Sequence, residues 1–400
     1  MKGQGEQMSI DQMAIHEQIE QIAPQIVADR RHLHAHPELS LEEYQTAAFI
    51  AARLDELSIA HRSIGRTGVL GTLPGRAKGP RIMLRADIDA LPLRDGCGAP
   101  WANTASEVNH ACGHDGHIAA LLGAAAVLVQ HRDDFDGVIE FAFQPAEEIG
   151  AGAILFERAK ELEGLDQVFG LHLVSGLPAG TVDSTAGAQW ASVDKFTIDV
   201  TGRGGHVAQP QLSQDALVTA ASIVVELQQV VARELDPFQP AVVGIGVLRC
   251  GENYNIIASS AHIEGTVRAF DEAVRAQLLA ALERIARGVG EAHRTRVVFS
   301  TRPYTDALSN DPGAAALAAQ VAARVPGVDH VVTDGVANAT GDDFAVFLHH
   351  APGVYLRVGS GGTPSTSVPH HSYGFALNEA ALPIAAELHV SYALSWFGTR

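Results

Sequence analysis

The order of predicted helices and strands changes twice along the chain, and this order restricts the possible folds more than any other feature. Up to about residue 188, and again after residue 303, helical and strand patterns alternate, which is typical of an α/β sheet with helices on its faces. Residues 189–302 instead follow the order β-α-β-β-α-β of a ferredoxin-like unit. We therefore expect an α/β domain with a helix-flanked mixed sheet, formed by residues 14–188 and 303–400, which is interrupted by an inserted α+β domain of residues 189–302.

Four local patterns predict particular structures. Ser40, with Glu43 three residues later, has the form of a capping box that begins a helix running to about Leu57. Residues 69–73 and 81–86 are apolar runs joined by a turn-rich segment, which predicts a hairpin. Residues 118–129 predict a buried helix, too short to cross about 30 Å of hydrocarbon. Residues 215–234 predict one amphipathic helix.

Charge and cysteine content exclude several classes of protein. The 28 basic and 46 acidic residues give a net charge of -18, which repels nucleic acid and anionic membrane surfaces. The first residues lack an apolar core of signal-peptide length and predict a loose tail before a helix. The three cysteines, Cys97, Cys112 and Cys250, are an odd number that cannot form a complete disulfide framework. We therefore expect a cytoplasmic protein that binds neither nucleic acid nor a membrane.

The segment from Asn109 to His117 is the densest group of potential metal ligands. It contains His110, Cys112 and His114 at a predicted strand-to-helix junction. Imidazole and thiolate groups are ligands of borderline and soft divalent ions. A polar loop that caps the next helix is the alternative interpretation, and the density of ligands favours the metal site.

Two adjacent carboxylates, Glu147 and Glu148, follow an apolar strand that contains Phe141 and Phe143. In α/β sheets, ligands bind at the carboxyl ends of the strands. A divalent ion would relieve the repulsion between the two carboxylates, because one ligates it while the other stays able to accept a proton. A solvated pair of glutamates is the alternative.

Two further histidines lie in separate segments. His172 is near the end of a predicted strand, and His371 follows a loop rich in glycine, serine, threonine and proline. Taken alone, His172 is more often a core residue and His371 could equally be a surface residue. Together, however, four separate segments offer cysteine, histidine and glutamate beside predicted strands, and this favours one shared site.

These motifs resemble those of the metal-dependent amidohydrolases and peptidases, a family that includes aminoacylases, hippurate hydrolases, auxin-conjugate (indole-acetyl amino acid) hydrolases and related carboxypeptidases. The resemblance runs in family order from about residue 30 to 375. Its HACGHDGH and FQPAEE stretches are highly specific, and the others are individually modest. The matching stretches are RHLHAHPE at 31–38, LRADIDALP at 84–92, HACGHDGH at 110–117, QPAEE at 144–148, GRGGH at 202–206, GTVR at 265–268 and GDDF at 341–344.

The resemblance implies two divalent metal ions per subunit and a general base and acid at Glu147. It also implies that the inserted domain is a lid and dimerisation surface, which predicts a homodimer or homotetramer. The implied metal ligands are Cys112, His114, Glu148, His172 and His371.

Three residues of the inserted domain, His206, Asn255 and Arg268, match positions that resemble the family's contacts to the substrate's carboxylate and reacting carbonyl. In related enzymes the histidine reaches into the partner subunit's site. The sequence also departs from the family pattern. The residue after Asn255-Ile256-Ile257 is alanine where the family has proline, and residues 340–344 are TGDDF where the family has GGEDF. Asp87 and Asp89 lie where distant relatives carry a ligand and a base-orienting carboxylate, and their roles are left open.

The implied reaction is hydrolysis of the amide bond of an acetyl-, benzoyl- or indole-acetyl-amino acid by metal-activated water, with metallo-carboxypeptidase or dipeptidase action on a short peptide as the alternative. Two other classes remain. Cys112 could be a thiol nucleophile paired with His110 or His114, or the chain could be a non-catalytic metal-binding protein, against which the carboxylate of Glu147 counts. Cysteine and histidine suit zinc, cobalt or nickel, whereas manganese is frequent among the enzymes that the chain resembles. The sequence does not fix the acyl or amino-acid preference.

Overall fold

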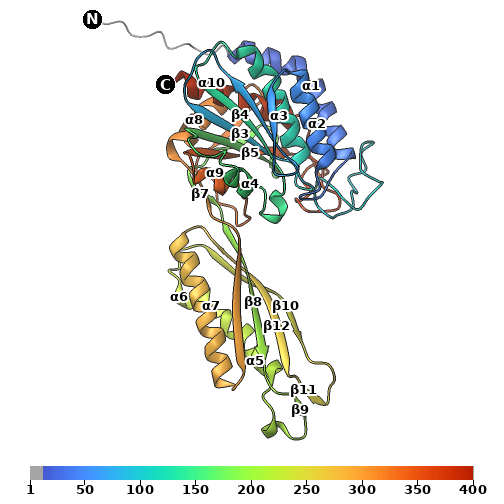
Figure 1. The fold of residues 1–400 in the computed structure, drawn as a ribbon, viewed down its shortest axis with the longest axis vertical. Helices are drawn as coiled ribbons and strands as arrows, with labels where there is room; N and C mark the ends of the chain where they lie inside the picture. The colour runs from blue at the N-terminus through green and yellow to red at the C-terminus, as the bar shows by residue number, and fades with distance from the viewer. Residues whose placement is uncertain (1–11, 400) are drawn as a thin grey trace, which may run out of the picture. The chain divides into compact units, whose positions relative to one another are not determined.

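The computed structural model describes residues 12–399, and the tail predicted before the first helix lies outside this range. Within it the chain divides into two compact units (Figure 1). The first comprises the residues up to Gly187, Ser309–Val336 and the residues from Asp343 onward, and the second comprises Ala188–Leu308 and Ala337–Asp342. The segment Ala337–Asp342 thus groups with the second unit and not, as the sequence predicts, with the first.

The first unit is built on a mixed sheet of eight strands in the order β1-β2-β4-β3-β5-β16-β6-β15, which confirms the predicted fold class. The four strands β4, β3, β5 and β16 are parallel to one another. Strands β2 and β1 are added at one edge, β2 antiparallel to β4 and β1 antiparallel to β2. The bounds are β1 (Ala60–Ile64), β2 (Gly68–Pro74), β3 (Arg81–Asp87), β4 (Val138–Gln144), β5 (Gln167–Pro178), β6 (Thr181–Asp183), β15 (His330–Val332) and β16 (Gly353–Gly361).

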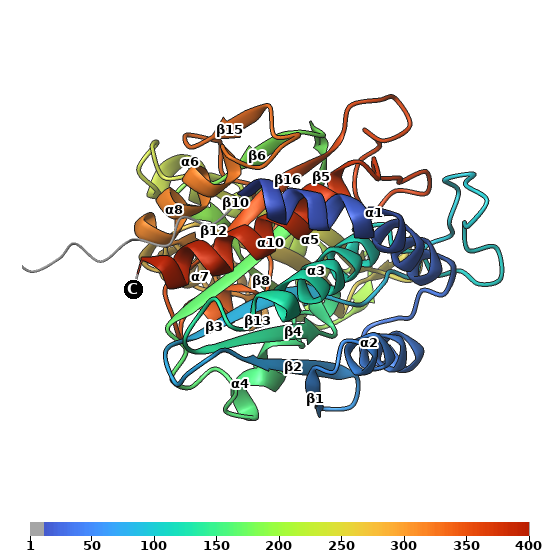
Figure 2. The ribbon, with the colours of Figure 1, turned by 90° about the horizontal axis from the view of Figure 1, so that it is seen from above.

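Helices cover this sheet, and α1, α3 and α10 pack against one another over one face (Figure 2). The helix α3 is apolar nearly throughout and buried along almost its whole length, as the sequence predicts. The helices of the unit are α1 (Gln12–Ala35), α2 (Tyr44–Glu56), α3 (His114–Leu128), α4 (Ala153–Arg158), α8 (Pro312–Ala322), α9 (Ala345–Leu348) and α10 (Ala381–Gly398), with short 3₁₀ turns η1 (Val129–His131) and η2 (Glu147–Ile149).

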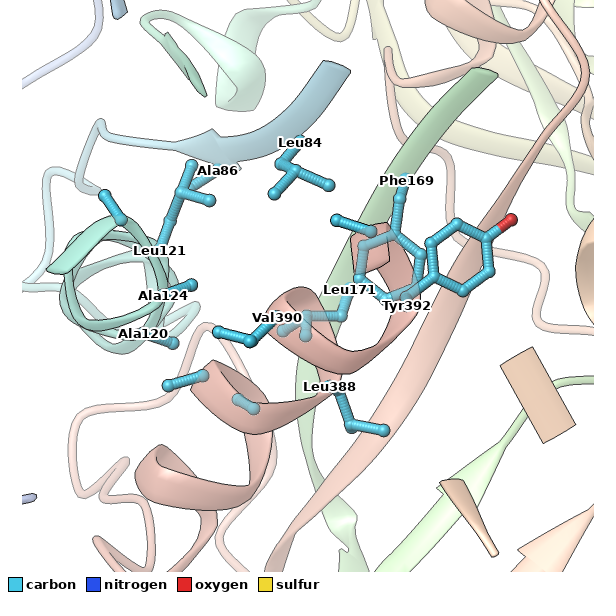
Figure 3. Packing of buried hydrophobic residues seen from close by; sticks show 14 of the residues in the cluster. Leu84, Ala86, Ala120, Leu121, Ala124, Phe169, Leu171, Leu388, Val390 and Tyr392 are labelled. Atoms are coloured by element: carbon cyan, nitrogen blue, oxygen red, sulfur yellow. The ribbon is translucent and has the colours of Figure 1, made fainter. Parts of the chain in front are cut away.

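Alternate residues of the central strands form the core on the α3 and α10 side of the sheet. Leu84 and Ala86 of β3 and Phe169 and Leu171 of β5 belong to the main cluster, together with Val390 of α10 (Figure 3). Because successive side chains of a strand point to opposite faces, the residues between them face the other side of the sheet. That side carries the polar groups described below.

Two local predictions are wrong. Strands β2 and β3 do not form a hairpin, because β4 lies between them and pairs with both. Ser40 and Glu43 do not form a capping box. Instead the Ser40 hydroxyl donates to Asp89 Oδ2 at 2.6 Å, and the first turn of α2 is capped by the carboxylate of Glu38, which accepts from the backbone N–H of Thr46 at 2.8 Å.

The second unit contains a four-stranded antiparallel sheet in the order β10-β12-β8-β13, with α5 and α7 packed on it. In chain order this is the ferredoxin-like arrangement that the sequence predicts. The bounds are β8 (Ser192–Thr201), β9 (Gly205–His206), η3 (Pro210–Leu212), α5 (Ala216–Leu227), α6 (Gln229–Glu234), β10 (Ala241–Cys250), β11 (Ile256–Ile257), β12 (Ser260–Ala269), α7 (Glu272–Ala292) and β13 (Arg296–Thr305), while β7 (Gly187–Trp190) and β14 (Leu308–Asn310) lie where the chain passes between the units.

The single helix predicted for residues 215–234 is two helices, α5 and α6, which meet at Gln228. The stretch Ala216–Glu234 is apolar and long enough to cross a membrane by length and composition alone. Of its most apolar 18 residues, 33% are buried in the structure. Ala220, Ile223 and Leu227 of α5 belong to the core of the second unit. That pattern is typical of an amphipathic helix that covers a sheet.

His389 in α10 allows a prediction about pH and stability. Its ring lies edge-on to Phe169 with centroids 5.0 Å apart, and within residues 12–399 neither ring nitrogen has a hydrogen-bond partner. Burial lowers the pKa of His389 to about 3. As the pH falls from 6.5 towards 3, the unfolded chain therefore takes up a proton that the folded chain does not, so stability present above pH 6.5 is lost.

We expect His389→Leu to be more stable than the parent, by about 2 kcal/mol more at pH 5 than at pH 7. Urea unfolding at both pH values measures this difference. His330→Leu, which removes an exposed histidine from the same unit, is the control and should leave the pH dependence unchanged. Equal pH dependence in the parent and His389→Leu would contradict the assignment.

Candidate metal centre

Asp87, Gln144 and His172 lie at the same level near the carboxyl ends of the neighbouring parallel strands β3, β4 and β5. Asp87 ends β3 and is paired in register with Gln144, which ends β4. Arg85 pairs with Gly170 of β5, which places Asp87 level with His172 two residues further on. The three therefore share one face and one edge of the sheet, on the side opposite the α3 and α10 core.

The HACGHDGH segment enters this edge from the start of α3. Gly113 precedes the helix with φ of 91°, a left-handed conformation that favours glycine. His114 is fully buried, and its Nδ1 lies 2.9 Å from the carbonyl oxygen of Asp89. That carbonyl can only accept, so Nδ1 carries a proton and Nε2 is the atom left to face the site. Within the described part of the chain, Nε2 of His114 has no hydrogen-bond partner.

His172 is oriented in the same way. Its Nδ1 lies 2.8 Å from the carbonyl oxygen of Leu173, so that Nε2 is left as the acceptor, 3.5 Å from Cys112 Sγ. His117 differs, because its Nε2 accepts from the backbone N–H of Leu173 at 2.9 Å and its Nδ1 lies 2.6 Å from Asp87. Its ring is thus occupied on both sides, and it supports the site without facing it.

The Glu147–Glu148 turn is held in a strained geometry. Ala146, just before it, has φ of 54°, which is rare for a residue with a side chain. The backbone N–H of Ala146 donates to Glu43 Oε1 at 2.9 Å, and that of Glu148 donates to Asp89 Oδ2 at 3.0 Å. The buried carboxylates of Glu43 and Asp89 therefore fix the direction of the turn.

His371 comes from a distant segment yet reaches the same place. It has φ of 58°, and its N–H donates to the carbonyl of Ala111 at 2.9 Å. Its Nε2 lies 3.4 Å from Glu148 Oε1. The backbone contact with Ala111 brings the segment after the glycine-rich loop against the HACGHDGH segment.

All the residues that the resemblance implies as ligands therefore lie together. Cys112, His114 and His172 form one group whose ligand atoms lie within 4.8 Å of one another, Cys112, Glu148 and His371 form a second, and His114, Glu147 and Glu148 form a third. These overlapping groups share Cys112, His114 and Glu148. The buried Nε2 of His114, without a hydrogen-bond partner among the described residues, and the mixture of sulfur, nitrogen and oxygen donors fit divalent cations.

The neighbouring groups shift the pKa values of several of these donors. Burial, followed by the Glu148 carboxylate, raises the pKa of the Cys112 thiol. Contact with Cys112, and then with Glu148, raises the pKa of His371 to about 10. Burial holds the pKa of His172 well below its usual value. A divalent ion would favour the thiolate and the neutral imidazoles that ligation requires.

A buried ionic network beneath the site is not apparent from the sequence patterns. The guanidinium of Arg85 donates to Asp87 at 2.7 Å, to Gln144 at 2.9 Å and to Asp343 at 3.1 Å. Asp343 in turn accepts from Gly152 and Ala153 at the start of α4. The sequence feature that could have revealed this network is the pair of charges in the strand segment LRAD, since charged residues are seldom buried unless they are paired.

His206, Asn255 and Arg268 all lie in the second unit. His206 is in β9, which pairs with β11 directly after Asn255, so these two are neighbours. The Nδ1 of His206 accepts from the N–H of Ala208 at 3.0 Å, which leaves Nε2 as the proton donor. Arg268 is near the other end of β12 and donates to the carbonyl of Ala339 at 2.7 Å.

One chain therefore does not place Arg268 beside Asn255. β12 begins at Ser260, on the β11 side, and Arg268 lies eight residues further along the strand, a distance of about 27 Å at the rise of a β-strand. Asn255 and Arg268 of one chain are therefore too far apart to bind the same carboxylate group.

Comparisons with known proteins identify similar hydrolases. The chain is 38% identical over 359 residues to an N-acetyl-L-cysteine deacetylase of Bacillus subtilis, covering 90% of this chain and 85% of that protein. It is 39% identical over 302 residues to an N-acyl-L-amino acid amidohydrolase of Geobacillus stearothermophilus, covering 74% and 81%. A crystal structure of a dinuclear metal-binding peptidase of the M20 family from Bacillus subtilis superposes with a TM-score of 0.84 at 33% identity, covering 95% of this chain and 100% of that one.

The family whose sequence profile matches residues 83–395 is described as peptidase family M20/M25/M40. This match spans more than half of the chain and includes the Asp87, HACGHDGH, Glu147–Glu148 and His371 segments that meet at the sheet edge. The resemblance seen in the motifs is therefore confirmed, and this chain is a hydrolase that belongs to peptidase family M20/M25/M40.

Proposed function

We propose that this protein is a metal-dependent amidohydrolase that cleaves the amide bond of N-acyl amino acids. One observation carries the proposal. Cys112, His114, His172, Glu148 and His371 present ligand atoms to one place, and the carboxylate of Glu147 lies within 4.8 Å of the His114 and Glu148 donors. The names of the deacetylase and amidohydrolase relatives support this choice over the carboxypeptidase and dipeptidase alternative.

The five donors would hold two divalent ions, and Cys112 belongs to both of the groups that contain only proposed ligands, Cys112–His114–His172 and Cys112–Glu148–His371. A bound ion of this kind lowers the pKa of water from near 16 to about 7 and polarises a carbonyl oxygen. Histidine and cysteine donors suit zinc, cobalt and nickel, and the carboxylate suits manganese. We infer manganese or zinc as the resident ion, with cobalt or nickel as possible substitutes.

In the proposed reaction, Glu147 accepts a proton from the attacking water and then donates it to the nitrogen of the leaving amino acid. A single carboxylate can serve both steps because it is returned to its ionised form at the end. Glu147 is suited to this role because it belongs to the turn that Glu43 and Asp89 hold rigidly. A side chain fixed by its neighbours stays in the productive geometry.

Each active site would receive groups from the second units of both subunits of a dimer. His206 and Asn255 lie at one end of its sheet and Arg268 at the other, so one substrate cannot contact all three from one chain. We infer that the Nε2–H of His206 stabilises the reacting carbonyl oxygen in the partner's site. Asn255, which neighbours His206, would enter the partner's site with it and there bind the carboxylate of the product amino acid together with Arg268 of the other chain, the guanidinium being the stronger carboxylate ligand.

The surface that would join two copies is the edge strand β10 with the neighbouring helix α5. Among the described strands β10 pairs only with β12, and an unpaired strand edge is a template for a second strand. Val242 and Leu248 of β10 and Val225 of α5 are exposed, Val225 by 69%. A groove lined by Val224, Gln228 and residues 243–248 runs between the two elements. A second copy meeting this face would cover these apolar groups and pair the edge.

Complementation between two inactive variants tests the shared site. We expect Glu147→Gln and His206→Ala to be inactive alone but to recover about a quarter of the parent's activity when they are reassociated at equal amounts, because half of the dimers are mixed and each mixed dimer has one complete site. Glu147→Gln with Cys112→Ser is the control and should stay inactive, since both residues belong to the same unit. No recovery in the first mixture would place His206 in its own chain's site.

Metal removal tests the proposed function itself. Dialysis against a chelator should abolish hydrolysis of acetyl-, benzoyl- and indole-acetyl-amino acids, and adding manganese or zinc should restore it. A thiol enzyme that used Cys112 as its nucleophile would keep its activity through chelation. Hydrolysis of dipeptides, with no hydrolysis of acyl amino acids, would favour the dipeptidase alternative.

We also infer a reducing, cytoplasmic location. Cys97, Cys112 and Cys250 are all unbridged, and a thiolate ligand at Cys112 requires that the thiol stay reduced. The net charge of -18 supports an enzyme of small substrates that binds neither nucleic acid nor anionic membranes.

A further inference from the structure

Outside the metal centre, a second group of potential ligands lies between α1 and the segment after β3. It consists of His34, Asp95 and Cys97, whose ligand atoms lie within 4.8 Å of one another. The Nε2 of His34 is 3.1 Å from Asp95 Oδ2 and 3.9 Å from Cys97 Sγ. None of the three residues is among the proposed ligands of the metal centre. We propose that these three side chains form a separate site for one thiophilic divalent cation, of which zinc is the representative.

The histidine is oriented as a ligating histidine requires. Its Nδ1 lies 2.7 Å from Asp115 Oδ2 and 3.1 Å from Arg30 Nη2, and the same carboxylate oxygen accepts from Arg30 Nε at 2.8 Å. The carboxylate contact is the shorter of the two, so we assign the Nδ1 proton to it, and Nε2 faces Asp95 and Cys97. A carboxylate behind the imidazole is the usual support of a metal-bound histidine, because it fixes the tautomer and the ring orientation.

The other two ligands are held by a short, ordered segment. Oδ1 of Asp95 accepts from the N–H of Cys97 at 2.9 Å, and Oδ2 accepts from the N–H of Asn103 at 2.9 Å. The side chains of His34 and Asp95 are fully buried, whereas Cys97 is only partly buried. An ion would therefore enter past the sulfur, and the buried histidine and aspartate would not have to move.

Charge and donor type fit a divalent ion at this place. The carboxylate of Asp95 and the thiolate of Cys97 would together balance the two positive charges of the ion. One nitrogen, one oxygen and one sulfur donor are a set that zinc accepts in tetrahedral geometry, with water as the fourth ligand. Magnesium and calcium, which prefer oxygen donors alone, would be excluded.

The site has a structural connection to the metal centre. Gly96, between the two loop ligands, donates its N–H to the carbonyl of Tyr373 at 2.7 Å, and Tyr373 follows His371 by two residues. An ion that fixes residues 95–97 would thus also hold the segment that carries His371.

Zinc counting on the full chain tests the site. The parent, Cys97→Ala and Cys250→Ala are loaded with excess zinc, passed through a desalting column and analysed for zinc per chain. We expect Cys97→Ala to hold one equivalent less than the parent, whereas Cys250→Ala, which removes a cysteine from the second unit, should match the parent. Equal zinc content in the parent and Cys97→Ala would overturn the proposal.

Thiol labelling of the parent decides the question even if Cys97→Ala does not fold. Zinc should slow alkylation of Cys97, measured by peptide mass spectrometry, and magnesium should not. The same protection should persist in Cys112→Ala, which alters the metal centre only, so failure of this site and failure of the metal centre are distinguishable. Alkylation of Cys97 at the same rate with and without zinc would overturn the proposal.

Discussion

Replacement of Glu147 by glutamine is expected to reduce turnover of an N-acyl amino acid by about 10²- to 10⁴-fold, the contribution typical of a positioned general acid–base. The amide keeps the size of the side chain but cannot accept the proton of the attacking water. Metal content should not change, because Cys112, His114, Glu148, His172 and His371 remain. The measurement is kcat at saturating substrate together with metal analysis of the same sample.

Glu163→Gln is the matched control, since Glu163 is an exposed carboxylate of the same unit, and its turnover should equal that of the parent. The result also separates the proposed reaction from its alternatives. A non-catalytic metal-binding protein would show no turnover to lose, and a thiol enzyme would depend on Cys112 more than on Glu147. Turnover of Glu147→Gln within a few-fold of the parent, with metal still bound, would show that another group moves the proton.

The second large effect is expected at Arg85, beneath the site. Its side chain is 1% exposed and is enclosed by Asp87, Gln144, Asp343 and Tyr355. Burial alone would raise the pKa of Asp87. The guanidinium of Arg85, followed by His114 and His117, nevertheless holds this pKa well below its usual range. Arg85→Met would leave buried carboxylates without their cation, a change that costs about 3–5 kcal/mol in the free energy of unfolding.

Urea unfolding of the metal-free protein measures this loss. Arg76→Met is the control, because Arg76 forms an ion pair with Asp136 in which both side chains are largely exposed, and its removal should not measurably change the unfolding midpoint. We also expect Arg85→Met to bind metal more weakly than the parent, since Asp343 would lose a partner while it holds the start of α4 beside the Glu147–Glu148 turn. Equal stability of the two variants would contradict the role given to Arg85.

The sequence predicts the elements of this fold better than their neighbours in space. Periodicity is a local property, so the strand that contains Phe141 and Phe143, the buried helix α3 and the inserted β-α-β-β-α-β order could be found from it. The pairing of β2 and β3 could not, because the strand that separates them comes more than fifty residues later in the chain. The partner of Ser40 could not be predicted either, since its hydroxyl donates to Asp89, which is distant in sequence and near in the fold.

The candidate site shows the same division. Cysteine, histidine and paired glutamates at predicted strand ends indicate a metal site, and the structure brings all five implied ligands together. The groups that orient them are not local. Asp89 contacts His114 and the backbone N–H of Glu148, and Glu43, which precedes α2, accepts from the N–H of Ala146. The separation of Asn255 from Arg268 depends on the register of β11 and β12, which only the paired strands reveal.

The most direct test of the account is a crystal structure of the metal-loaded enzyme, with anomalous diffraction recorded at the absorption edge of the bound metal. The account predicts two peaks a few ångströms apart, one or both contacted by Cys112, His114, Glu148, His172 and His371, with the carboxylate of Glu147 beside them and not bound. A single peak elsewhere, or a site in which Cys112 and His172 contact no ion, would contradict it.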